Sequence, residues 1–165
     1  MPVSKVLVLG LGNDILTDDA VGLHVITAVR HRLAGESGID VKATTEMGLA
    51  LLDEIADRES VVLIDSVQTG KAPLGHVSEI AVDSLSRVLN TAPHFLGIGE
   101  TLALGKLLGL AMPGRVRIFA VEVADPFTLS TQMNPAVEAA VADAADRVVA
   151  AARECAQETK PAPEA

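Results

Sequence analysis

The fold of this chain is decided by residues 6–22, VLVLGLGNDILTDDAVG, an apolar run followed by a glycine turn and the start of a helical pattern. A dinucleotide-binding turn needs glycine at its first, third and sixth positions. Gly10 and Gly12 fit that pattern, but the sixth position is Ile15. Carboxylates at positions 14, 18 and 19 crowd a helix N-terminus that should hold a phosphate. The turn therefore repels pyrophosphate and suits a cation.

The composition favours a sheet that is buried on both faces. The chain has 165 residues, enough for one domain with a sizeable core. Hydrophobic residues make up 49% of it, but it has only three phenylalanines and no tryptophan or tyrosine. Aliphatic runs of this kind are typical of parallel sheets, which helices cover on both faces.

Strand-like and helix-like segments alternate along the chain. Strands are predicted at residues 5–10, 39–44, 61–64 and 116–123, with an alternating, more edge-like strand at 76–82. Helices are predicted at residues 19–33, 48–56, 83–89, 97–112 and 135–156, the first capped by Thr17 or Asp18 and the last by Asn134. This order predicts an α/β fold: a three-layer, mostly parallel twisted sheet of about five strands flanked by helices, of the phosphorylase/hydrolase-like kind. We expect one domain over residues 1–156 and a disordered tail over 157–165.

The net charge of −9 restricts the possible partners. Neither nucleic acid nor an anionic membrane surface would be attracted through a basic patch. Cys155 is the only cysteine, which excludes a disulfide within the chain and an all-cysteine metal site. The sequence shows neither a secretory signal nor an apolar run of about 20 residues. We therefore expect a cytoplasmic protein that binds neither nucleic acid nor membrane, and we expect it to be a monomer.

Polar residues just beyond the predicted strand ends mark the candidate site, because ligands of parallel α/β sheets bind outside the carboxyl ends of the strands. Asp18 and Asp19 follow the first strand, Asp65 ends the third, and His94 lies in a loop predicted over residues 90–94. Two carboxylates and an imidazole suit a borderline divalent metal such as nickel, zinc or manganese. Three protein ligands leave coordination positions open for catalysis or for sharing the metal with another molecule.

Each of these residues also has a simpler structural interpretation. Asp18 or Asp19 can cap the first helix and complement its dipole, although two adjacent acids exceed what a cap requires. Asp65 can be a turn former, and His94 can be a loop histidine with a backbone hydrogen bond. Glu122, within or just after the last strand, is placed where it can border the same site.

Three motifs, in this order, resemble the nickel–iron hydrogenase maturation endopeptidases. They are Val-Leu-Gly-Leu-Gly-Asn-x-x-Leu-x-Asp-Asp-x-x-Gly at residues 8–22, Val-Leu-Ile-Asp-Ser-Val at 62–67 and Pro-His-x-x-Gly at 93–97. The segment at residues 121–137 is similar to the last strand, loop and final helix of the family. The resemblance covers roughly residues 4 to 152.

The resemblance implies a function and a partner. Members of the family remove a C-terminal extension from the hydrogenase large subunit once nickel has been inserted. Their nickel-recognising residues correspond to Asp19, Asp65 and His94, which are thus the expected metal ligands and catalytic residues. The expected partner is a hydrogenase large-subunit precursor, which supplies the nickel. Many members carry a glycine-rich Asp-Gly-Gly-Thr stretch where this chain has Ala43–Glu46, a departure that concerns substrate choice more than chemistry.

Two other functions share parts of the pattern. A peptidyl-tRNA hydrolase-like esterase begins similarly to residues 8–13, but it needs a histidine soon afterwards and a basic surface for tRNA. A non-enzymatic, receiver-type phosphoacceptor module also has acids after its first strand and an aspartate at the end of its third. It needs a lysine at the end of its last strand, where this chain has Glu122-Val123-Ala124-Asp125. Both stay alternatives to the endopeptidase.

Overall fold

A computed structural model describes residues 5–12, 20–45, 49–83, 93–124 and 133–158, without the side chains of residues 93–97. The described strands are β1 (Val6–Leu11), β2 (Ile39–Thr44), β3 (Ser60–Val67), β4 (Val77–Ile80) and β5 (Arg115–Glu122). The described helices are α1 (Val21–Arg32), α2 (Leu49–Ile55), α3 (Pro93–Leu107) and α4 (Pro135–Glu158). The strands form one sheet in the order β2-β1-β3-β5-β4, in which β4 alone is antiparallel to its neighbour. The predicted α/β fold is confirmed, and so is the edge position of the fourth strand.

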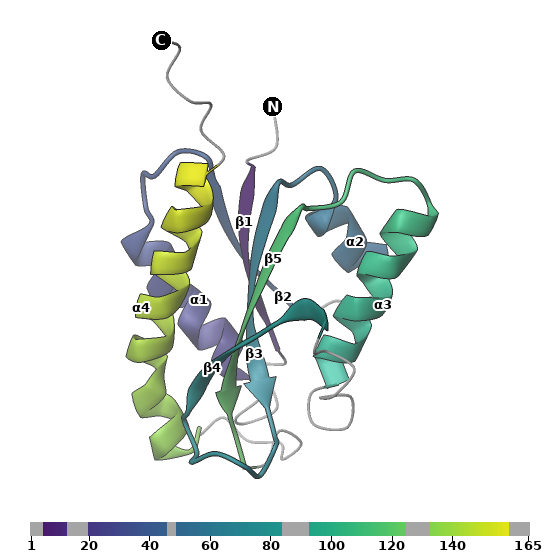
Figure 1. Cartoon of the computed structure of the whole chain (residues 1–165). Helices are drawn as coiled ribbons and strands as arrows, with labels where there is room; N and C mark the ends of the chain where they lie inside the picture. Colours follow the sequence, from purple (N-terminus) through teal and green to yellow (C-terminus); the bar gives the residue numbers. More distant parts are fainter. Residues whose placement is uncertain (1–4, 13–19, 46–48, 84–92, 125–132, 159–165) are drawn as a thin grey trace.

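The sheet separates two apolar clusters. Every residue of β1 and β3 is buried, as expected for central strands covered on both faces. One cluster joins alternate strand residues to α1 and α4, and the other joins the remaining strand residues to α2 and α3. Figure 1 shows the same three layers, with α1 and α4 on one side of the sheet and α2 and α3 on the other. None of the described helices is long and apolar enough to cross a membrane.

Several element boundaries differ from the prediction. The third strand continues to Val67, so Asp65 lies inside it instead of ending it. Helix α3 begins at Pro93 instead of residue 97, because the fixed φ and missing N–H of proline suit the first position of a helix. It ends at Leu107 in a Schellman motif, with the N–H of Leu110 bonded to the carbonyl of Gly105 at 3.0 Å.

The two predicted helix caps had different outcomes. Asn134 caps α4, since its Oδ1 accepts a 2.9 Å hydrogen bond from the N–H of Ala136. Ala20 occupies the N-cap position of α1 and supplies no side-chain cap. Thr17 and Asp18, the predicted caps of this helix, lie outside the described residues. The helix predicted over residues 83–89 lies almost entirely outside the described residues. Helix α4 extends to Glu158, two residues into the predicted tail, and residues 159–165 lie outside the described part.

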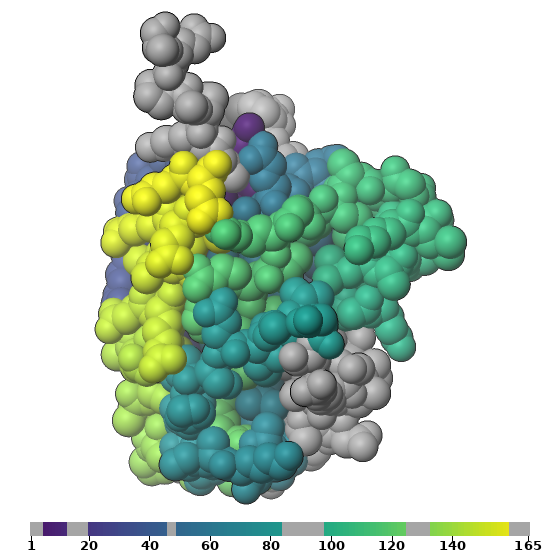
Figure 2. All heavy atoms as spheres, viewed as in Figure 1, coloured from purple at the N-terminus to yellow at the C-terminus, as the bar shows by residue number. Residues whose placement is uncertain are grey.

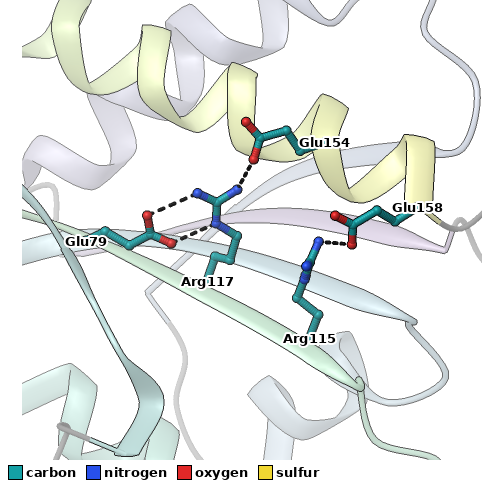
Figure 3. Close-up of polar contacts among 5 residues, drawn as sticks. All are labelled: Glu79, Arg115, Arg117, Glu154 and Glu158. Carbon is teal, nitrogen blue, oxygen red and sulfur yellow. Dashed lines mark hydrogen bonds and ion pairs between the residues drawn. The ribbon is translucent and has the colours of Figure 1, made fainter.

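Ion pairs tie α4 to the edge of the sheet. Arg117 on β5 donates two hydrogen bonds to Glu79 on β4, at 2.7 and 3.0 Å, and a third to Glu154 on α4, at 2.6 Å (Figure 3). Beside it, Arg115 pairs with Glu158 at the end of α4. Hydrogen bonding to Arg117 holds the pKa of the Glu79 carboxyl below its usual value, and hydrogen bonding to Glu79 raises the pKa of Arg117. These pairs therefore link β4, β5 and α4 to one another.

Candidate active site

Asp65 lies near the carboxyl edge of the sheet, on the central strand β3. Its side chain is fully buried, and its Oδ1 accepts a 2.7 Å hydrogen bond from the backbone N–H of Ser66. Because side chains alternate along a strand, Asp65 shares a face with Leu63 and Val67, which belong to the cluster beneath α2 and α3. A buried carboxylate loses favourable hydration, and hydrogen bonds offset only part of that loss. Because Asp65 lies inside β3, with two strand residues after it, the interpretation of Asp65 as a turn former is wrong.

Helix α1 is packed directly on the ends of β1 and β3. A Cβ atom at Gly22 would lie 2.2 Å from the carbonyl oxygen of Leu11 and 2.8 Å from that of Ile64. A Cβ atom at Gly10 would lie 2.2 Å from Cγ1 of Ile26. These glycines of the opening motif thus bring the first turn of α1 over the residue that precedes Asp65. Asp19 itself lies outside the described residues.

Helix α3 begins on the sheet face that carries Asp65. Ile98, in the second turn of α3, is fully buried in the same cluster as Leu63 and Val67. The N-terminal end of α3 lies at the carboxyl edge of the sheet, where β3 and β5 end (Figure 1). His94 is the second residue of this helix, so its predicted placement in a loop is wrong. The side chain of His94 lies outside the described part of the structure.

The backbone brings Asp65 and the position of His94 to one edge, and Asp65 is the one predicted ligand whose side chain is described. Within the described residues, no three histidine, cysteine, aspartate or glutamate side chains lie close enough together to hold a metal ion. Asp65 is the described member of the predicted set, while the side chains of Asp19 and His94 fall outside. The ligand set of Asp19, Asp65 and His94 therefore stays a prediction.

Glu122 is a second buried carboxylate at the same edge. It is the last residue of β5, its exposed fraction is 2%, and it pairs in register with Val67 of β3. Its Oε2 accepts a 2.8 Å hydrogen bond from the N–H of Thr69, and its Oε1 accepts one from the Thr69 hydroxyl. Glu122 lies two residues beyond Ala120, the register partner of Asp65, on the neighbouring strand. The hydrogen bonds between Glu122 and Thr69, in the segment after β3, were not predicted. A single glutamate among apolar strand residues is nevertheless a signal that a polar side chain is buried there.

Two surface grooves formed by described residues lie away from Asp65. One groove of about 760 Å³ runs between α1 and α4 and includes His24, His31 and Glu138 in its lining. Another of about 550 Å³ lies between α3 and the start of β5, with Leu102 and Val116 in its lining. Neither has Asp65 among its described lining residues. The buried carboxylates near the strand ends therefore indicate where the candidate site lies, and neither of these two grooves marks it.

Sequence comparisons with known proteins point to one family. Residues 24–151 match the hydrogenase maturation protease family, a span that contains Asp65 and His94 and begins after Asp19. The chain is 26% identical over 159 residues to the hydrogenase 2 maturation protease of Escherichia coli K12, covering 95% of this chain and 96% of that protein. It is also 26% identical over 177 residues to the hydrogenase expression/formation protein HoxM of Azotobacter vinelandii, covering 99% and 84%.

Solved structures show the same fold. The hydrogenase maturating endopeptidase HybD from Escherichia coli superposes with a TM-score of 0.78 at 26% identity, covering 91% of this chain and 93% of that one. The hydrogenase 2 maturation peptidase of a Thaumarchaeota archaeon superposes with a TM-score of 0.64 at 26% identity, covering 89% and 97%. The fold is that of the α/β hydrogenase maturation endopeptidases, which are peptide hydrolases. The chain belongs to the hydrogenase maturation protease family.

Proposed function

We propose that this protein is the endopeptidase that removes the C-terminal extension of a nickel–iron hydrogenase large subunit during maturation. The observation that carries the proposal is the buried Asp65 at the strand edge where α1 and α3 both begin, in a chain of this family. The substrate is the large-subunit precursor with nickel already in place. Processing would take place in the cytoplasm, the compartment predicted from the sequence.

Asp19, Asp65 and His94 are the proposed contacts to the nickel of the precursor. Two carboxylates and one imidazole leave coordination positions for the ligands that the precursor itself provides. The metal belongs to the substrate, so an unmetallated precursor would not be held productively. Near the scissile peptide, the carboxylates of this chain can orient the attacking water and accept its proton, while the metal polarises the carbonyl. This arrangement supports an aspartic-type hydrolysis coupled to nickel recognition.

The test is processing of a purified nickel-loaded precursor by Asp19→Ala, Asp65→Asn and His94→Ala variants. Each substitution removes a metal contact or a proton acceptor, so we expect the rate to fall roughly 10²- to 10⁴-fold. The readout is the shortening of the precursor on a gel and by mass spectrometry, with a nickel-free precursor run in parallel.

Matched controls are Asp53→Asn and His31→Ala, which change exposed residues of the same types on α2 and α1. These controls should process at the wild-type rate. Normal processing by the Asp19, Asp65 and His94 variants, or equal processing of nickel-free and nickel-loaded precursors, would contradict the assignment.

A further inference from the structure

We propose that Glu122 is a positioning residue that holds in shape one wall of the substrate-binding surface beside Asp65. The wall is the segment Gln68–Gly75, here called the β3–β4 wall, which leaves β3 just beyond Asp65. This inference rests on the proposed function, because it assigns the wall to binding of the large-subunit precursor. It concerns a residue and a surface that the ligand set of Asp19, Asp65 and His94 does not include.

The β3–β4 wall crosses the end of β5 before it returns as β4. The end of β3 and the two ends of the wall are hydrogen-bonded to Glu122 and to the two residues that follow it. The N–H of Val123 bonds to the carbonyl of Val67 at 2.9 Å, and the side-chain amide of Gln68 donates to the carbonyl of Ala124. At its far end, the N–H of Gly75 bonds to the carbonyl of Glu122 at 2.8 Å. The wall is thus fixed to the carboxyl edge of the sheet at both ends.

The side chain of Glu122 holds the start of the wall at Thr69. Both of its oxygens accept hydrogen bonds from Thr69, one from the backbone N–H and one from the hydroxyl. The Thr69 hydroxyl in turn accepts a 3.1 Å bond from the N–H of Lys71. Hydrogen bonds to an ionised acceptor are roughly twice as strong as bonds between neutral groups. Within the described residues no lysine, arginine or histidine pairs with Glu122, and the N–H and hydroxyl of Thr69 are the hydrogen-bond donors to its side chain.

This contact is made beside Asp65. Asp65 pairs in register with Ala120, and Val67 pairs with Glu122, so both carboxylates lie on one face of adjacent strands. Two residues along a strand and one strand across correspond to about 8 Å between Cα atoms. A shift of the wall would therefore change the space directly next to the buried carboxylate of the site.

The outer surface of the wall is open to solvent. Gln68, Lys71 and Leu74 are exposed, whereas Glu122 beneath them is buried. A Cβ atom at Gly75 would lie 2.4 Å from the carbonyl oxygen of Ala136, so the wall also rests against the start of α4. Figure 2 shows this segment at the lower edge of the molecule, next to the first turns of α4. Such a preformed surface loses little conformational freedom when a polypeptide binds to it.

The experiment measures kcat and KM for nickel-loaded precursor with the wild type, Glu122→Ala and Glu122→Gln. Loss of two charge-assisted hydrogen bonds should lower kcat/KM of Glu122→Ala by about 10-fold or more, mainly through KM. Glu122→Gln keeps an oxygen that accepts from the Thr69 N–H and should stay within about 3-fold of the wild type. Hydrogen exchange at Thr69 and Lys71 should accelerate in Glu122→Ala and remain slow in Glu122→Gln.

The stability control is Glu79→Ala, which breaks an ion pair at the outer side of β4 and leaves the wall bonds intact. Equal kcat/KM for Glu79→Ala and Glu122→Ala would overturn the proposal. A Gln variant as impaired as the Ala variant would also overturn it, because a chemical role of the carboxylate would then replace a positioning role.

A further variant covers the case in which Glu122→Ala does not fold. Thr69→Val removes both bonds of the hydroxyl, to Glu122 and from the Lys71 N–H, keeps the bond from the Thr69 N–H to Glu122, and should raise KM by about 3-fold. An unchanged KM would overturn the proposal. Failure of the wild type itself to process the precursor would refute the proposed function. Hydrogen exchange at Thr69 would still decide separately whether Glu122 holds the wall.

Discussion

At Gly22 a hydrogen atom in place of a side chain determines how closely α1 approaches the sheet. The carbonyl oxygens of Leu11 and Ile64 occupy the space that a Cβ atom would need. These oxygens belong to the backbone and cannot turn aside as a flexible side chain would. Gly22, the last glycine of the opening motif, is thus a packing residue, and it places the start of α1 over the residue that precedes Asp65.

Gly22→Ala should destabilise the protein and impair processing together. Overpacking of this kind costs typically 1–3 kcal/mol, and relief requires α1 to move away from the strand ends. The free energy of unfolding in urea and the rate of precursor processing are the measurements. Gly35→Ala provides a control for loss of a glycine, because nothing lies within 4 Å of a Cβ there, although its φ of +82° adds local strain. Wild-type processing by Gly22→Ala would contradict the role given to this contact.

Among the elements, α4 shows how a helix start supports the site edge. Asn134 accepts the hydrogen bond from Ala136 with its side chain, and its carbonyl accepts a 2.9 Å bond from Glu138. The next residues contact Gly75 at the end of the β3–β4 wall. Buried alanines and valines along α4 then fasten the helix to the sheet.

Asn134→Ala should lower the free energy of unfolding by about 1 kcal/mol, since it removes the side-chain cap of α4. Asn134→Asp keeps an acceptor and adds a charge that the helix dipole favours, so its stability should stay near that of the wild type. Urea unfolding followed by circular dichroism measures both. Because the cap lies next to the wall, hydrogen exchange at Gly75 should also accelerate in the Ala variant. Slower exchange or unchanged stability would argue against the capping role.

At the scale of the whole molecule, ion pairs place some of the many carboxylates of this acidic chain next to arginines. Its net charge is −9, yet Arg117 holds Glu79 and Glu154 together on the outer side of the sheet (Figure 3). The guanidinium also lies 5.6 Å from the centre of the Phe119 ring. Since these side chains are partly exposed, water and salt screen the pairs and limit their contribution to stability.

The pH dependence of this contribution follows from the lowered pKa of Glu79. Its ionised form is favoured in the folded state, so the stabilisation is present above the unfolded pKa, near 4.5, and is lost as the pH falls through the folded pKa. At pH 7 the free energy of unfolding of the wild type should exceed that of Glu79→Gln by less than about 1 kcal/mol, and this gap should close in acid. Urea titrations from pH 7 to pH 3 measure the gap, with Glu138→Gln as a control. A gap that widens in acid would contradict this account.

The sequence by itself determined the order of elements, the mostly parallel sheet and the edge position of β4. Those features follow from aliphatic runs, residue alternation and glycine or proline signals, all of which act within a few residues. The same patterns placed Asp65 near the carboxyl edge, because it follows a run of buried aliphatic residues, although the strand itself continues to Val67. They also placed Glu122 within or just after the last strand, where it can border the site.

Only the tertiary structure decided which groups those residues meet. The pairing of Glu122 with Thr69 joins residues 53 positions apart, and the contact of Gly22 with Ile64 joins α1 to a strand that is not its neighbour in sequence. Likewise, the extension of β3 through Val67 depends on its pairing with β5, which continues to Glu122. The physical reason is that strand pairing and close packing are set by distant partners, whereas sequence patterns report the local preferences of the backbone.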